Sequence, residues 1–405
     1  MKLCGIASLL RHGSISTLCW MHFFWGMASS MIFSLLPIFI VEELGGSSRS
    51  FGLLEGAVVF TSFVAKIFAG FIIDAFRKKV PMLRVGTVFT VFSKLFLACA
   101  PNVFFVFVSK SLDRFAKGLR QAPSDAILAG LDADKGLIFS LRYSMNLAGF
   151  LIGSVITSVT VHLIGPSYRI IFAASVVPTV IALCILQKKI KGDDDHYEAK
   201  EKHKWNIKDI ASLPCGYWAF MVVVILLMFN RFSEGFITLK AKSVMPKQTE
   251  LFPMFMSVYE VCAACVAIPI GRMSDRIKKK NALVLGIGLL VIADIFGIFS
   301  NSWYSVISIY IFSGLHMGAT QGVLGAIIAR SAPQHLMGTA FAIFYGVEGV
   351  ALLCANSFAG MMPGVAKSIG LPEASGPFIM GVVASITAIL YTLTVSDRLE
   401  HTHSR

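Results

Sequence analysis

The sequence predicts an all-α membrane protein in which twelve transmembrane helices form two pseudo-symmetric six-helix bundles. Three observations predict it: an apolar composition, apolar runs of membrane-spanning length, and a motif that recurs half a chain apart. The 405 residues are 56% hydrophobic and 15% charged, with a mean hydropathy of +0.73. Soluble domains have about 45–50% apolar and about 25% charged residues. The excess lies in segments of about 20 residues, long enough to span a bilayer as helix.

The apolar runs between polar stretches place the expected spans in chain order. The first six lie near residues 17–41, 51–75, 82–101, 103–122, 138–163 and 167–187. The second six lie near residues 216–239, 251–273, 281–299, 303–329, 335–361 and 376–395. We therefore expect an N-terminal bundle at 1–187, a charged linker at 188–215 and a C-terminal bundle at 216–405.

The loop charges predict the orientation of the chain. Cations follow spans two, six and eight at 77–79, 188–191 and 276–280, whereas the opposite loops around Asn102 and Asn301 carry none. Cytoplasmic loops are enriched in Lys and Arg. Both termini and the linker are therefore expected on the cytoplasmic side of a bacterial inner membrane. The same loops explain the net charge of +13, and we expect lipid rather than nucleic acid as the partner of this charge.

A motif repeats at an offset of 201 residues, as GFIIDAFRKK from Gly70 and GRMSDRIKKK from Gly271. It resembles the signature of the major facilitator superfamily (MFS) after the second helix of each half: glycine, three residues, aspartate, arginine, any residue, glycine, then cations. Asp275 and Arg276 match its acid-base pair, while Lys278 stands in place of the second glycine. The first copy departs further, with Ala75 and Arg77 in place of arginine and glycine.

This resemblance implies the MFS fold and a latch between the two bundles at the cytoplasmic side. The gating residues implied are Asp74, Arg77, Asp275 and Arg276. Three further runs, FGLLEGAVVFTSFVAKIFAGFIIDAFRKK, LDRFAKGLRQAPSDAILAG and RFSEGFITLKAK, look like a bacterial subgroup of the superfamily whose members are described only as transporters.

Span four carries the densest set of charges within the membrane. Lys110, Asp113, Arg114, Lys117 and Gln121 are spaced by three and four residues, so they share one helical face. Ionisable groups in a transmembrane helix cost about 2.5–3.5 kcal/mol on insertion scales, so this face must look inward. In the resembled family helices one, four, seven and ten line the central cavity. We expect the first three residues to bind substrate, and Lys117 to take part in gating or loop anchoring.

Three other spans offer candidate substrate-binding residues. In span seven Asn230, Arg231 and Glu234 are expected within one helical turn, where Arg231 and Glu234 could equally pair with each other. Span ten contributes His316 and Gln321, and span one contributes Trp25. Ordinary packing is an equally open explanation for Trp25, and the more common one for a lone histidine.

Candidate proton-coupling residues are the carboxylates Glu55, Glu260 and Glu348. Burial in a low-dielectric site disfavours a charged carboxylate, which makes proton exchange accessible, although each could instead be paired with a cation. Gly314, Gly318 and Gly322 recur every four residues of span ten, a stripe of small residues that indicates close helix packing rather than a site.

The resulting functional expectation is a monomeric secondary transporter that works by alternating access, is coupled to protons and binds a small anionic solute. A carboxylate, an organic phosphate or an iron-chelate siderophore would suit the cations. Efflux of cationic drugs and a non-transporting membrane sensor remain alternatives. The chain has no G-x-x-x-x-G-K-[ST], H-E-x-x-H or G-x-S-x-G motif, so neither ATP-driven pumping nor an intramembrane enzyme is expected, and no cofactor or metal is expected.

Overall fold

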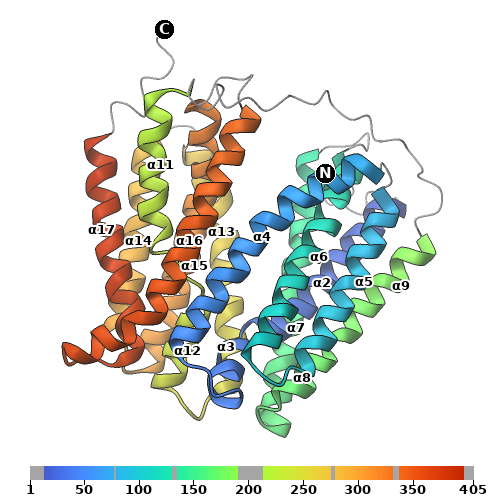
Figure 1. Ribbon diagram of the computed structural model, residues 1–405, viewed down its shortest axis with the longest axis horizontal. Coiled ribbons are helices and arrows are strands. Elements are labelled where there is room, and N and C mark those ends of the chain that lie inside the picture. Colours follow the sequence, from blue (N-terminus) through green and yellow to red (C-terminus); the bar gives the residue numbers. More distant parts are fainter. Residues whose placement is uncertain are drawn as a thin grey trace. The chain divides into compact units, whose positions relative to one another are not determined.

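The computed structural model describes residues 13–76, 79–129, 135–189, 213–274, 279–331 and 337–395. Helices connected by short turns make up these residues, and the described ranges contain no strand (Figure 1). This confirms the prediction of an all-α protein.

Each of the first six expected spans coincides with a helix or a series of short helices. They are α2 (Gly13–Phe33) with α3 (Leu36–Ile38) and the π turn η1 (Phe39–Glu43), α4 (Ser48–Phe76), α5 (Lys79–Ala98), α6 (Val103–Ala129), α7 (Lys135–Ile164), and α8 (Tyr168–Ala174) with α9 (Val176–Lys189). The fourth helix exceeds its expected end near residue 122, because Pro123 is accommodated inside α6.

The second six expected spans also coincide with helices. They are α11 (Cys215–Met228) with α12 (Gly235–Val244), α13 (Phe252–Ser274), preceded by the short η2 (Thr249–Leu251), α14 (Lys279–Phe299), α15 (Trp303–Ser331), α16 (Met337–Ser368) and, after the short η4 (Glu373–Ser375), α17 (Gly376–Thr394). Eight helical segments of the described chain are long and apolar enough to cross a membrane, and Cys215–Met228 is a shorter apolar helix. The count of twelve spans stays a prediction.

The chain divides into two compact units that do not follow the chain order strictly. Unit 1 contains 1–45, 61–202 and 249–257, and unit 2 contains 46–60, 203–248 and 258–405. The first part of α4 therefore packs within unit 2, although the sequence places it in the first half. The expected boundaries at 187 and 216 stay a prediction.

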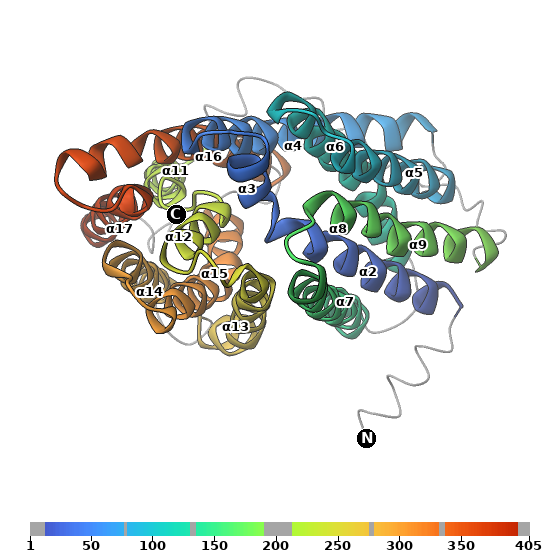
Figure 2. The same cartoon turned by 90° about the horizontal axis from the view of Figure 1, so that it is seen from below.

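Within unit 1, helices α2 and α7 lie side by side, as do α5 and α6 (Figure 2). Small residues allow the first approach: a Cβ atom on Gly149 would collide with the carbonyl of Phe23, and one on Gly153 would lie 2.9 Å from the Cα of Met27. Helix backbones at this separation require glycine, as is common in membrane bundles.

Within unit 2, α14 packs on α15 and α17 (Figure 2). Gly314 and Gly318 of α15 meet the carbonyls of Tyr259 and Ala263 on α13 so closely that a Cβ would clash. The expected packing role of the glycine stripe is confirmed at these two positions. A cluster of buried side chains around Tyr217 and Phe220 forms the core of this unit.

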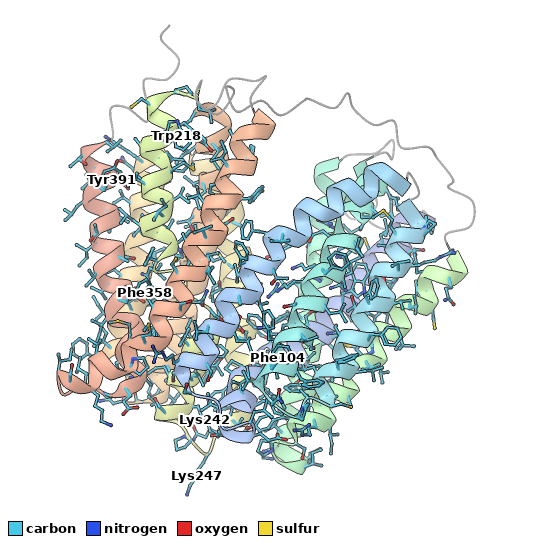
Figure 3. All side chains as sticks on the ribbon, in the orientation of Figure 1. Phe104, Trp218, Lys242, Lys247, Phe358 and Tyr391 are labelled. Carbon is cyan, nitrogen blue, oxygen red and sulfur yellow. The ribbon has the colours of Figure 1, made fainter. Side chains whose placement is uncertain are left out.

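Large apolar side chains are exposed along the outer faces of the helices. Trp218, Phe358 and Phe104, which are labelled in Figure 3, have exposed fractions of 40%, 51% and 67%. Soluble proteins rarely leave so much apolar surface in contact with water. The exposed surface is therefore suited to lipid, as expected for a multi-pass membrane protein.

Candidate functional site

A cluster of charges lies inside unit 1, between α5 and α6. Lys94 of α5 is 5% exposed, and its Nζ donates to the carbonyl of Ala28 at 3.4 Å. On α6 the carboxylate of Asp113 accepts from the hydroxyl of Ser93 at 3.5 Å. Asp113 interacts electrostatically with four cations, Lys94, Arg114, Lys117 and Arg120. Within the described part of unit 1, these cations therefore gather around one carboxylate.

Two donors in this unit have no acceptor among the described residues. Arg120 is 6% exposed and Trp25 is 5% exposed, and the guanidinium of Arg120 lies 4.5 Å from the centre of the Trp25 ring. Neither the Nη1 of Arg120 nor the Nε1 of Trp25 makes a hydrogen bond within the described chain. A buried unsatisfied donor costs about 1–3 kcal/mol, so such donors point to an oxygen atom that a bound molecule would supply.

His22 connects this pair to its surroundings. Its ring meets the Trp25 ring edge to face at 4.9 Å, and its Nε2 lies 3.1 Å from the hydroxyl of Ser124. The side-chain amide of Asn146 on α7 donates to the His22 carbonyl at 2.9 Å. These contacts hold α2 in place, so that Trp25 is presented to Arg120 in one fixed orientation.

The structure brings the candidates of span four only partly together. Lys110, Asp113 and Arg114 are partly buried, whereas Lys117 and Gln121 are exposed. Exposure of these two side chains is compatible with a water-filled cavity, so the expected inward face stays a prediction. Lys94 and Arg120 join the cluster, and neither was among the expected binding residues.

Unit 2 contains an interrupted helix. Helix α11 ends at Met228 and α12 begins at Gly235, with Glu234 as its N-cap residue (Figure 1). The expectation that Asn230, Arg231 and Glu234 share one helical turn is therefore wrong. The side chain of Asn356 on α16 accepts a hydrogen bond from the backbone N–H of Ser233 at 2.7 Å. This N–H has no partner within a helix, so Asn356 supplies its acceptor. Broken helices in transporters are places where side chains and backbone groups face a binding site.

Arg231, at the break, is held by helix α15. Its Nε donates to the Nε2 of His316 at 3.2 Å, and its Nη2 donates to the hydroxyl of Thr320. Because an arginine can only donate, the Nε2 of His316 must accept. The Nδ1 of His316 then carries the proton and donates to the carbonyl of Gly286 at 2.8 Å. His316 is thus a neutral positioning residue for Arg231.

Carboxylates also surround the break. Glu234 accepts from the hydroxyl of Tyr259 at 3.2 Å, and Arg231 interacts electrostatically with Glu234 and Glu348. Glu260 interacts with Tyr259. Glu348 therefore acts on Arg231 at the break, and Glu260 acts on Tyr259, the hydrogen-bond partner of Glu234. Glu55, the third candidate for proton coupling, is buried in unit 2.

Asn230, the neighbour of Arg231 in the interrupted segment, makes contacts of its own. Its side-chain amide donates to Asp294 on α14 at 2.6 Å and to the hydroxyl of Ser385 on α17 at 2.5 Å. Asp294 is 2% exposed. The sequence shows Asp294 as one of several charged residues inside a span, and nothing in its neighbours marks it as a partner of Asn230.

Several candidates cannot be placed by the structure. The gating residues Arg77, Asp275 and Arg276 lie outside the described residues, and the side chains of Asp74 and Gln321 are not described. The gate and the role of Gln321 stay predictions.

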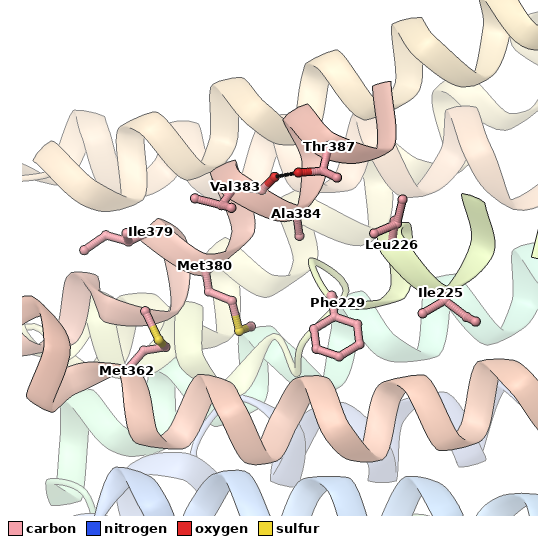
Figure 4. A pocket seen from close by; sticks show the side chains of 9 residues that line it. All are labelled: Ile225, Leu226, Phe229, Met362, Ile379, Met380, Val383, Ala384 and Thr387. Atoms are coloured by element: carbon pink, nitrogen blue, oxygen red, sulfur yellow. Dashed lines mark hydrogen bonds between the residues drawn. The ribbon is translucent and has the colours of Figure 1, made fainter. Parts of the chain in front are cut away.

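An apolar groove of about 450 Å³ lies in unit 2 (Figure 4). Its lining residues are Ile225, Leu226, Phe229, Met362, Ile379, Met380, Val383, Ala384 and Thr387. The hydroxyl of Thr387 donates to the carbonyl of Val383 at 2.8 Å, as the dashed line in Figure 4 shows. A groove with these groups is suited to hydrocarbon and not to a charged solute, so the polar clusters are the better candidates for a substrate site.

The fold and the buried charges define a class, that of polytopic membrane transporters. Residues 18–239 and 211–404 each match the model of the Major Facilitator Superfamily, and the chain belongs to this superfamily. An uncharacterized MFS-type transporter of Methanocaldococcus jannaschii is 26% identical over 91% of both chains. An uncharacterized MFS-type transporter of Bacillus subtilis, YqjV, is 30% identical over 33% of both chains. A multidrug resistance protein of Photorhabdus laumondii, MdtH, is 29% identical over 32% of both chains.

Solved transporters share the fold at low sequence identity. A mutant of the nucleoside transporter NupG is 10% identical with a TM-score of 0.81, covering 94% of this chain and 99% of that chain. A POT family transporter solved with a conjugated peptide is 13% identical with a TM-score of 0.75, covering 95% and 96%. A bacterial homolog of the lysosomal transporter Spinster is 11% identical with a TM-score of 0.69, covering 95% of both chains. The MFS fold predicted from the repeated motif is confirmed.

Proposed function

We propose that the protein is a secondary active transporter that moves a small anionic organic solute by alternating access, coupled to protons. The anionic solute is inferred from the pair of buried donors on Trp25 and Arg120 that have no hydrogen-bond acceptor among the described residues. A carboxylate or phosphate oxygen accepts from both groups, and charge-assisted hydrogen bonds of this kind are shorter and roughly twice as strong as neutral ones.

The surrounding charge supports the same class of solute. Three buried or partly buried cations, Lys94, Arg114 and Arg120, act on Asp113, so an anion entering this cluster adds negative charge beside them. A cationic drug would instead be repelled by the buried Lys94 and Arg120. Efflux of cationic drugs is therefore the less favoured candidate, although the relative of Photorhabdus laumondii is named a multidrug resistance protein.

The test compares thermal stabilisation of the purified protein by carboxylates, organic phosphates and metal chelates. Trp25→Phe removes the indole N–H and keeps an aromatic ring against Arg120. Loss of a hydrogen bond to a charged group costs about 1.5–3 kcal/mol, so this variant is expected to bind the stabilising anion about 10-fold more weakly or worse. Arg120→Gln, which removes the cation, is expected to abolish the stabilisation.

Trp20→Phe is the matched control, because Trp20 lies on the same helix α2 but is 44% exposed and should leave the affinity unchanged. Equal affinity of the wild type and of Trp25→Phe for the anion would show that the indole N–H does not bind it. Stabilisation by tetraphenylphosphonium, and by none of the anions, would favour efflux of cations. Counterflow of the stabilising anion in liposomes then separates a carrier from a non-transporting sensor.

A further inference from the structure

The Asn230–Asp294–Ser385 cluster contains a carboxyl group in surroundings that do not suit a carboxylate ion. Asp294 is 2% exposed, and among the described residues it has one hydrogen-bond partner, Asn230 at 2.6 Å, and no ion pair. Transfer of an isolated carboxylate to such a site is so unfavourable that the group neutralises instead. The neutral acid is therefore the form that this environment accepts.

Several ionisable groups on the elements packed against Asp294 have other partners. Arg231 donates to His316 and Thr320, Lys240 donates to Ser375 at 2.8 Å, and Glu373 pairs with Lys367 at 2.9 Å. The ionisable groups with described side chains on these elements include Lys280 on α14, His316 on α15, Glu373 in η4, Tyr391 on α17, and Arg231, Glu234 and Lys240 around the break.

Asn230 offers the partner that a neutral acid needs. Its buried Oδ1 has no donor among the described residues, while its nitrogen already donates to Asp294. A carboxylic acid placed beside an amide accepts one hydrogen bond and donates another, which satisfies both groups. A metal ion is disfavoured, because two atoms 2.6 Å apart leave no space for an ion between them.

We propose that Asp294, paired with Asn230 and supported by Ser385, is a proton-binding site that fixes the break between α11 and α12. Asn230 lies two residues beyond the end of α11 at Met228, so the state of Asp294 acts directly on the interrupted segment. When the proton leaves, Asp294 can no longer donate to the Oδ1 of Asn230, and the carboxylate needs water or a cation. The interrupted segment then loses one of the hydrogen bonds that fix it. This inference rests on the proposed proton coupling and names a residue for it.

Infrared spectroscopy of the purified protein tests the protonation directly and needs no substrate. A carboxylic acid C=O stretching band is expected that disappears in Asp294→Asn and persists in Glu373→Gln, the matched control at an exposed carboxylate. Ser385→Ala retains the acid but removes one hydrogen bond to Asn230, so the band is expected to shift. A spectrum without a band attributable to Asp294 at any pH would overturn the proposal.

Hydrogen–deuterium exchange of residues 229–236 tests the link to the break. After correction for intrinsic exchange, the protection of this segment is expected to fall in wild type as the pH rises and Asp294 loses its proton. Asp294→Asn, which mimics the neutral acid, is expected to keep the protection at every pH. Unchanged protection in wild type across the loss of the infrared band would overturn the link.

Sodium provides a further distinguishing result. Stabilisation of wild type by sodium chloride over choline chloride, lost in Asp294→Asn, would make the cluster a cation site and overturn the proton assignment. The infrared band is independent of the solute, so it can be present even if the anionic solute proposed above is wrong. A normal band together with transport that ignores the pH gradient would instead overturn the proton coupling.

Discussion

At the scale of single residues, the chemistry of the candidate sites depends on close approach. Gly381 on α17 sits against the Asn230–Asp294 pair, and a Cβ placed there would collide with the Oδ1 of Asn230 and lie 2.8 Å from the Oδ2 of Asp294. The absence of a side chain at this position therefore makes the pairing possible.

Gly381→Ala is expected to lower the free energy of unfolding by about 1–3 kcal/mol, the usual range for overpacking a close-packed interior. The measurement is the unfolding temperature in detergent. Gly288→Ala on α14 is the control, because a Cβ there meets nothing within 4 Å and alanine favours the helix by up to about 1 kcal/mol. Equal effects of the two substitutions would show that Asn230 and Asp294 can move apart without loss.

Residues also show how much of the site could be predicted from the sequence. The charges of span four identified Asp113 and Arg114, because a polar helical face in a membrane must look inward. Lys94 and Arg120 were not selected, since their membership depends on how α5 rotates against α6, which is a tertiary property. Trp25 was selected by its depth in the first span, but its unpartnered N–H becomes visible only beside Arg120.

At the scale of elements, the interruption of the seventh span is the feature that sequence reasoning missed. No proline lies in 229–234, and the nearest glycine, Gly235, is already the first residue of α12. The available signal is the polar run Asn-Arg-Phe-Ser-Glu inside an apolar span. Such a run is compatible with a continuous helix whose charges pair, so it did not distinguish the two structures.

Asn356→Leu is expected to loosen the interrupted segment between α11 and α12, because it leaves the backbone N–H of Ser233 without its acceptor at 2.7 Å. A buried unsatisfied donor costs about 1–3 kcal/mol, and leucine keeps the apolar volume. Hydrogen–deuterium exchange of residues 229–236 is expected to rise. The neighbouring Ser357→Ala removes only a hydrogen bond to Leu353 on its own helix and should leave this exchange unchanged. Unaltered exchange in Asn356→Leu would mean that the break does not depend on α16.

Where α4 packs against α16 within unit 2, position 52 is expected to accept no residue larger than glycine. A Cβ on Gly52 would lie 2.9 Å from the Cα of Gly360 and would collide with the carbonyl of Asn356. Gly52→Val should therefore separate the two helices and lower the unfolding temperature, at about 1–3 kcal/mol. Gly364→Ala is the control on α16, since its Cβ would meet nothing within 4 Å. Equal unfolding temperatures for the two variants would contradict this account of the packing.

At the scale of the whole molecule, the apolar runs and the repeated motif were sufficient to predict the helical segments and the superfamily. The units were less predictable, because 46–60 joins unit 2 and 249–257 joins unit 1. Sequence order identifies which residues form a helix, but the partner of each part of a long helix depends on packing. Glycine positions such as Gly52 and Gly360 provide that information only when both are seen together.

The orientation of the chain in the membrane gives the last prediction. The cations after spans two, six and eight predict a cytoplasmic linker, so the loop after α12 is expected on the opposite side. Lys247 in that loop is exposed (Figure 3). In a background with the eight native cysteines replaced, Lys247→Cys should react with an impermeant maleimide in intact cells, and Lys191→Cys in the linker should react only after permeabilisation. Reaction at position 191 in intact cells would show that the chain has the opposite orientation in the membrane.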